Sequence, residues 1–437
     1  MADETFDITV EGATALGTEL TQAFNPRRAQ PGAQAAPEPD DTWELEGGTA
    51  WVWRVPGSEG LTNPVIIADG FSGGASKLEE WAGLWAQSDI EDVYPWGTKL
   101  HEKERDVIVL GYDSRCAPIR DNAEVAIECI QRATAKRTGT KPLVVGGLSM
   151  GGLVTRYALA KLEKEDPEHE VGTYFSYDSP HQGAWIPISL QVFAHFLAGL
   201  ADLLNVPPAE NEEKKKQLKA LSDLINSTAA RELLWKHTAT HKNLDAQFDP
   251  DPARGEFLSA LAALESTPST LKKLGVANGR GDGEPLLGVT PGAPNLVWPR
   301  KLIPDTLIYG PGATLYAQKD GNDQLVAKLQ KAALAGEITV KTTGIPALDG
   351  APGGMLDSFG LAGQALKDAG YQATVAFPDV CFVPVASAVD LAEPSDPFKP
   401  IDEIVGESFL HEYKVASQNE RHTLLTQELC DWLTEQF

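Results

Sequence analysis

The segment at residues 142–165, PLVVGGLSMGGLVTRYALAKLEKE, constrains the fold of this chain more than any other part of the sequence. It opens with an apolar run typical of a buried strand, turns within residues 147–151, and continues with helical periodicity. A strand that enters a helix through so short a turn favours a parallel sheet covered by helices.

Neighbouring segments repeat this pattern. Residues 63–74 and 104–114 each hold a short apolar run that ends in glycine or polar residues, and residues 171–183 supply a further strand. Residues 122–135 show helical spacing, and residues 43–56 alternate like a hairpin. We therefore expect an α/β fold with a mainly parallel sheet and helices on both faces.

The remaining regions suggest how the chain is divided. Residues 1–43 are expected to form an N-terminal arm and linker, because residues 25–42 are rich in Pro and Ala. Residues 44–437 would form the main domain. Within it, residues 185–270 predict a helical cap, and the Gly- and Pro-rich residues 285–378 predict a β-rich insertion of unassigned topology. Residues 381–391 look like the last core strand, and residues 423–437 like a closing amphipathic helix.

Composition excludes several classes of partner. The sequence has 62 acidic and 37 basic residues, a formal charge of -25 that repels nucleic acid and anionic membranes. The four cysteines lie far apart and form no CxxC pair, so neither a zinc knuckle nor a disulfide-dense scaffold is expected. We expect no metal and no cofactor. The sequence shows no membrane span and no signal peptide, which predicts a cytoplasmic protein, or a secreted one if a leader was removed beforehand. The oligomeric state is not predicted.

The turn within residues 147–151 has the pattern G-x-S-x-G, with a strand before it and a helix after it. Such a turn forces its serine into a strained conformation that only small neighbours such as Gly147 and Gly151 tolerate. The strain lifts the hydroxyl above the sheet edge, next to the N–H groups that begin the helix. Ser149 is therefore the predicted nucleophile, and a structural glycine turn is the alternative.

A nucleophilic serine needs donors for the developing oxyanion. The segment IIADGFSGG follows a predicted strand upstream, where a second donor is expected. The backbone N–H groups of Phe71 and Met150 are the candidates, although a loop without a catalytic role would have the same sequence.

Serine also needs a base, which in this arrangement follows the last strand. His422 lies between that strand and the final helix, while His411 lies further back and is the alternative. His181 follows Asp178 so closely that we expect it to fix its own loop by hydrogen bonds.

Three aspartates are candidates for the acid that orients the histidine. Asp178 follows the strand after the elbow helix, Asp379 precedes the apolar run at residues 381–391, and Asp282 follows another plausible strand. Each is equally compatible with a turn or cap. We favour Asp178 and leave Asp379 and Asp282 open.

With these residues identified, the chain resembles bacterial lipase-like α/β hydrolases and, more broadly, the lecithin-cholesterol acyltransferase and triacylglycerol lipase group. The resemblance rests on GGLSMGGLVTRYAL, on DSPHQGA, and on FVPVASA followed by a late histidine. It covers mainly residues 64–191 and 381–437. It implies an α/β-hydrolase fold, and the acid position of pancreatic-type lipases corresponds to Asp178. Asp69 stands where lipases often carry histidine.

The expected activity is hydrolysis of a carboxylic ester through an acyl-enzyme on Ser149, with a small-molecule or acyl-ester substrate. An amidase, a peptidase or an acyltransferase would use the same residues, and a non-catalytic binding protein would keep the fold alone. Trp185 and Phe193, in an apolar stripe after Gly183, are candidates for an acyl pocket or for plain core.

Overall fold

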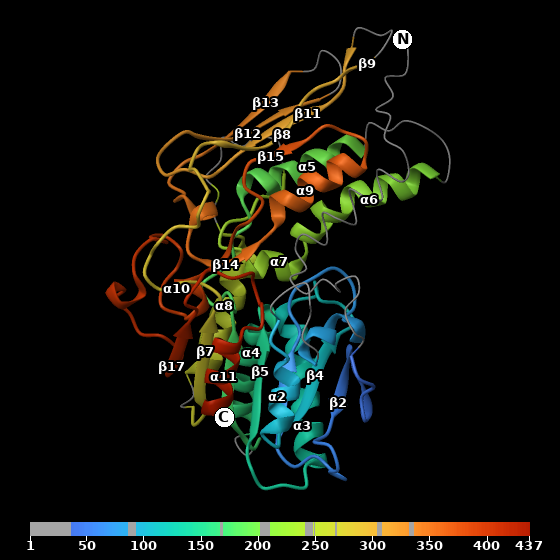
Figure 1. The fold of residues 1–437 in the computed structure, drawn as a ribbon, viewed down its shortest axis with the longest axis vertical. Coiled ribbons are helices and arrows are strands. Elements are labelled where there is room, and N and C mark those ends of the chain that lie inside the picture. The colour runs from blue at the N-terminus through green and yellow to red at the C-terminus, as the bar shows by residue number, and fades with distance from the viewer. Residues whose placement is uncertain are drawn as a thin grey trace.

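The computed structural model describes residues 36–85, 93–166, 169–201, 210–240, 248, 250–266, 269–303, 308–331 and 336–437. The arm expected over residues 1–43 therefore lies mostly outside the described residues. β1 begins at Asp41, before the expected boundary at residue 44. Figure 1 shows a central sheet at one end of the molecule and a smaller, antiparallel sheet at the other.

The central sheet has eight strands in the order β1-β2-β4-β3-β5-β6-β7-β17. Strands from β4 to β17 run parallel, and β2 joins β4 in antiparallel fashion, so the expected α/β class with a mainly parallel sheet is confirmed. The hairpin expected over residues 43–56 is formed by β1 and β2. The strands are β1 (Asp41–Leu45), β2 (Gly48–Trp53), β3 (Pro64–Ala68), β4 (Asp106–Tyr112), β5 (Leu143–Leu148), β6 (Val171–Tyr177), β7 (Lys272–Ala277) and β17 (Glu412–Val415).

Helices cover both faces of this sheet, and alternate residues of each strand supply the two cores. In β3, Val65 and Ile67 pack with α2 and α11, whereas Ile66 and Ala68 pack with α3 and α4. Full burial of such aliphatic side chains stabilises the fold by about 1.5–3 kcal/mol each. The elements on the two faces are η1 (Leu78–Leu84), α2 (Trp96–Glu102), α3 (Ile119–Lys136), α4 (Met150–Glu165) and α11 (Gln427–Gln436).

The last strand of the central sheet is not the one expected from the sequence. The apolar run at residues 381–391 gives β16 (Val380–Pro384) and the short helix α10 (Val385–Ala388), and β16 pairs with β14 (Gly353–Leu356) in a separate two-stranded sheet. β17 takes the edge position beside β7 instead. The prediction failed because β16 is as fully buried as a central strand, but η2 (Leu348–Gly350), α10 and β14 cover it.

The region expected as a helical cap contains α5 (Ile188–Ala201), α6 (Glu210–Ile225), α7 (Thr228–Leu233) and α8 (Pro252–Glu265). These helices separate into two places. α5 and α6 pack against each other, and α5 also contacts β11 and β12 of the antiparallel sheet. α8 packs on α4 of the main domain, where Tyr157 and Phe257 stack at 6.1 Å.

Residues 285–378 contain all strands of the antiparallel sheet, which has the order β13-β12-β11-β8-β15 and lies at the top of Figure 1 above α5 and α9. Helix α9 (Ser358–Asp368) contacts β8 and β15. The strands of this region are β8 (Pro294–Trp298), β9 (Leu302–Ile303), β10 (Ile308–Tyr309), β11 (Gly312–Tyr316), β12 (Gln324–Gln330), β13 (Glu337–Thr342) and β15 (Thr374–Val375), and η3 (Ile401–Glu403) lies further along the chain.

Candidate active site

Ser149 lies in a turn that joins β5 directly to α4. Its backbone has φ 55 and ψ −125, a conformation that costs energy for any residue except glycine. A Cβ at Gly147 would lie 2.4 Å from the carbonyl carbon of Gly151, and a Cβ at Gly151 would lie 2.3 Å from the carbonyl oxygen of Ala68. Only glycine fits at these two positions, so the G-x-S-x-G pattern is a packing requirement of the turn.

Three residues far apart in the sequence form one chain of hydrogen bonds. Ser149 Oγ lies 2.7 Å from His422 Nε2, and His422 Nδ1 lies 2.6 Å from Asp178 Oδ2. The three residues are 3%, 1% and 0% exposed, respectively. A carboxylate only accepts hydrogen bonds, so Nδ1 carries the proton and Nε2 is left to accept from the serine hydroxyl. In this tautomer the imidazole can take a proton from Ser149.

The backbone and the carboxylate of Asp178 are both fixed by hydrogen bonds. Its backbone lies in the left-handed region with φ 49, and its N–H donates to the carbonyl of Val276 at 2.7 Å. Its second carboxylate oxygen, Oδ1, accepts from the backbone N–H of Asn278 at 2.9 Å. A Cβ at Gly354 would lie 1.9 Å from Oδ2, so a glycine at this position leaves room for the carboxylate. Both oxygens of Asp178 therefore have a defined donor.

His422 is fixed through its backbone, its ring and its loop. Its N–H donates to the carbonyl of Met355 at 2.8 Å, and its ring meets the edge of Phe382 at 4.8 Å between centroids. Two residues further on, the carbonyl of Leu424 accepts from Tyr177 Oη at 2.8 Å and from Asn278 Nδ2 at 2.9 Å. Sequence reasoning missed Asn278, whose only signal was a polar residue directly after a buried strand at the same sheet edge.

The other predicted candidates for base and acid make contacts elsewhere. His411 Nδ1 accepts from the backbone N–H of Lys273 at 3.3 Å and is exposed. Asp379 pairs with Arg421 at 3.6 Å, and Asp282 pairs with Arg280 on the surface. The structure therefore brings Asp178, and neither Asp379 nor Asp282, to His422.

The two predicted oxyanion donors lie on segments that are packed together. Gly151, the residue after Met150, closely approaches the carbonyl groups of Ala68 and Asp69, directly before the loop that carries Phe71. Within the described part of the chain, the backbone N–H groups of Phe71 and Met150 have no hydrogen-bond acceptor. Both donors are thus available beside the serine turn.

A buried arginine fixes the loop that carries Phe71. Arg115 Nη1 lies 2.7 Å from Glu80 Oε2 and 3.6 Å from Asp69 Oδ2, and its Nη2 donates to the carbonyl of Gly73 at 3.3 Å. The Arg115 side chain is 4% exposed. Arg115, Asp69 and Glu80, which we call the Arg115 cluster, hold both ends of this loop.

The two candidates for an acyl pocket are both buried, in different surroundings. Phe193 lies on α5 and packs in a T-shaped arrangement with Trp298 of β8, with 6.3 Å between the ring centroids. It therefore forms part of the contact between α5 and the antiparallel sheet. Trp185 donates from its indole N–H to Asp349 Oδ1 at 2.8 Å, and its backbone N–H donates to the carbonyl of Phe382. Only Trp185 is thereby connected to a residue that contacts His422.

Within the described residues, no group of three or more His, Cys, Asp or Glu side chains is placed to hold a metal ion. In the same residues, no helix is both long and apolar enough to cross a membrane.

No family model matches the sequence, and no curated protein matches it. Among solved structures, the chain is similar to several bacterial and archaeal lipases and esterases. The mature Bacillus licheniformis lipase is 13% identical, with 41% of this chain and 67% of that one covered and a TM-score of 0.25.

Two further structures give comparable values. Brefeldin A esterase, a bacterial homologue of human hormone-sensitive lipase, is 14% identical over 59% of this chain and 75% of its own, with a TM-score of 0.28. The esterase of the hyperthermophilic archaeon Pyrobaculum calidifontis is 14% identical over 60% and 81%, with a TM-score of 0.29.

Proposed function

We propose that this chain is a serine hydrolase of the α/β-hydrolase superfamily that cleaves a carboxylic ester. The observation that carries the proposal is the buried chain of hydrogen bonds from Ser149 through His422 to Asp178. A base within reach of a hydroxyl, and an acid that sets its tautomer, are the parts that serine catalysis needs.

In the proposed reaction, Ser149 Oγ attacks the ester carbonyl carbon while its proton moves to His422 Nε2. The imidazolium that forms is stabilised by Asp178, and the carbonyl oxygen becomes an oxyanion that accepts from the N–H groups of Phe71 and Met150. His422 then protonates the departing alcohol, which leaves an acyl-enzyme on Ser149. A water molecule, deprotonated by His422, releases the carboxylic acid by the same steps in reverse order.

Two features support the oxyanion assignment. The donors Phe71 and Met150 sit on segments that approach within van der Waals contact, and the Arg115 cluster restrains one of them. Fixed donors are effective because they need no reorganisation as charge develops. Ser149 is 3% exposed, so the nucleophile is largely shielded from bulk water.

An amidase, a peptidase or an acyltransferase would use the same groups, since they differ only in the leaving group or the second acceptor. A non-catalytic binding protein remains the alternative of another class. For the substrate, we propose an acyl ester whose chain lies near Trp185, with Phe193 further along the apolar stripe.

Covalent labelling tests the proposal. A fluorophosphonate should label the parent protein at Ser149, and Ser149→Ala should abolish both labelling and the hydrolysis of p-nitrophenyl esters while the melting temperature is retained. His422→Ala should lose nearly as much activity, whereas His411→Ala serves as the control and should not. Labelling at another serine, or no labelling of the folded parent, would refute the assignment. A series of esters of increasing chain length then measures the acyl preference.

A further inference from the structure

The loop at residues 178–183 carries the proposed triad acid and is neither helix nor strand. Asp178 at its start has φ 49, and Gly183 at its end has φ 115. Residues other than glycine rarely adopt a positive φ, and such conformations persist only where the surroundings hold them. The position of the Asp178 carboxylate therefore depends on the groups that contact this loop.

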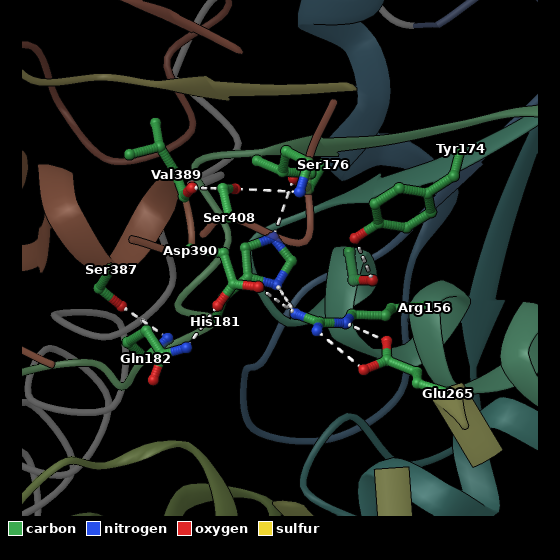
Figure 2. A network of polar contacts seen from close by, with 12 residues as sticks. Arg156, Tyr174, Ser176, His181, Gln182, Glu265, Ser387, Val389, Asp390 and Ser408 are labelled. Atoms are coloured by element: carbon green, nitrogen blue, oxygen red, sulfur yellow. Dashed lines mark hydrogen bonds and ion pairs between the residues drawn. The ribbon is translucent and has the colours of Figure 1, made fainter. Parts of the chain in front are cut away.

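One buried side chain connects the loop to the helix of the nucleophile. Arg156 lies on α4 about two turns after Ser149 and is 9% exposed. Its Nη1 lies 3.1 Å from His181 Nδ1 and 2.9 Å from Asp390 Oδ2. Its Nε and Nη2 donate to the two carboxylate oxygens of Glu265 at 2.6 and 3.0 Å. Figure 2 shows this guanidinium between Glu265 on one side and His181 with Asp390 on the other.

The arginine also determines which nitrogen of His181 carries the proton. A guanidinium can only donate, so Nδ1 of His181 accepts and Nε2 holds the hydrogen. Nε2 then donates to Ser176 Oγ at 3.0 Å. Ser176 lies near the end of strand β6, just before the loop. Burial lowers the pKa of His181 to about 3, consistent with a neutral ring beside a cation.

The far end of the loop is held by the segment after β16. Gln182 donates from its side-chain amide to Asp390 Oδ1, and its backbone N–H donates to Ser387 Oγ at 3.1 Å. Ser387 in turn donates to the carbonyl of Gly183 at 2.8 Å. Asp390 thus accepts from Arg156 with one oxygen and from Gln182 with the other, as Figure 2 shows.

We propose that Arg156, His181, Gln182 and Asp390, which we call the acid-loop clamp, are positioning residues for the hydrolytic reaction. The clamp fixes the loop of the triad acid relative to the helix that begins at the nucleophile. It touches neither the substrate nor Ser149, and it acts by keeping Asp178 aligned with His422. This inference rests on the proposed function.

The decisive variant removes the hydrogen bonds of the His181 ring and leaves the ion pairs of Arg156 in place. His181→Leu deletes both ring contacts, while Arg156 keeps Asp390 and Glu265 as partners. We expect fluorophosphonate labelling of Ser149 to slow by about tenfold or more, since a displacement of about 1 Å near reacting groups has effects of this size. The acidic limb of the pH–rate profile should move to lower pH, because an imidazolium with a displaced carboxylate is less stable. His181→Asn supplies an acceptor to Arg156 and should restore most of the rate.

The matched control is His195→Leu, the same substitution at another buried histidine. His195 is 4% exposed, and its ring hydrogen-bonds to Ser222 Oγ at 2.8 Å and to the carbonyl of Thr238 at 2.6 Å, neither of which belongs to the clamp or to residues 178–183. This variant should lower the melting temperature without changing the labelling rate or the pH profile. If His181→Leu fails to fold, Gln182→Leu replaces it, with a labelling rate at least about threefold below the parent.

The outcomes separate this inference from the proposed function. A folded parent that is not labelled overturns both. A labelled parent, with His181→Leu or Gln182→Leu labelled at the parental rate and with the parental pH profile, overturns the clamp alone. A slower rate that His181→Asn does not restore also overturns it, because the link to Arg156 would then be irrelevant.

Discussion

Two irregular loops flank Ser149, and each contacts a buried arginine that lies between two carboxylates. The loop with Phe71 is held by Arg115, between Asp69 and Glu80. The loop with Asp178 is held by Arg156, between Glu265 and Asp390. In both places, one cation with several fixed donors shapes a loop that has no regular backbone hydrogen bonding.

The two arginines differ in where their partners come from. Asp69, Glu80 and Arg115 all belong to the first strands and connections of the central sheet. Glu265 ends α8, and Asp390 follows β16, so Arg156 is satisfied only after the inserted regions have folded. The side with the proposed oxyanion donors is thus self-contained, whereas the side with the proposed acid depends on the insertions.

We expect the largest effect from a substitution of the proposed acid itself. Asp178→Asn should lower turnover by about 10⁴, because an amide favours the wrong tautomer of His422. Ester turnover and melting temperature should be measured together with Asp379→Asn and Asp282→Asn, which should lose little activity. If Asp178→Asn melts early and still turns over ester at a near parental rate, Asp379 is the next candidate for the acid.

The second prediction breaks the oxyanion side. Arg115→Met should lower kcat/KM by about 10², since the loop that carries one of the two oxyanion donors loses its support. The free energy of unfolding, measured with urea, should fall by about 3 kcal/mol because two carboxylates lose a buried partner. The acidic limb of the pH–rate profile should stay in place, since the contact between Asp178 and His422 is untouched. A shifted limb would show that the two sides are not independent.

The third prediction uses pH to distinguish the sides. His181 belongs to the acid side, and burial lowers its pKa to about 3 in the folded chain, against 6.5 for a free histidine. Between these values the unfolded chain binds a proton that the folded chain does not, so stability falls as pH falls below about 6.5. From about pH 7 to about pH 5, the parent should lose about 2 kcal/mol more than His181→Asn, measured by urea unfolding. Equal losses in the two proteins would contradict the buried, neutral state of His181.

The smallest effects come from neutralising one carboxylate on each side. Glu265→Gln and Glu80→Gln each keep a hydrogen-bond acceptor and should cost about 1 kcal/mol. Hydrogen exchange should quicken at residues 178–183 in the first variant and at residues 69–74 in the second. Faster exchange at both loops in either variant would mean that the loops are coupled.

Sequence patterns predicted best what is encoded locally. The strand, turn and helix around Ser149 depend on neighbours within a few residues, and Gly147 and Gly151 are required by contacts inside the same turn or with the adjacent strand end. The late histidine followed from its place before the last helix. Among the three aspartates the sequence favoured Asp178 but left the other two open, because the choice depends on which strand ends the fold brings beside His422.

The errors have the same origin. β16 has the apolar run of a central strand, while the true edge strand β17, EYKV, is half exposed and lacks such a run. In the antiparallel sheet, β15 pairs with β8, although the two strands are far apart in the sequence and α9 comes between them. Hydrophobic periodicity does not indicate such a long-range pairing. Arg156 and Asp390 are separated by 234 residues, so their pairing has no local signature.

The order of the proposed triad along the chain has a consequence for synthesis on the ribosome. Ser149 and His422 are 273 residues apart, and the strand β17 and the histidine loop come after both insertions. A growing chain that has already folded its first strands carries a serine without a base. If the proposed function holds, its hydroxyl stays as unreactive as any other serine until the histidine loop folds, so the nascent protein does not attack the esters around it.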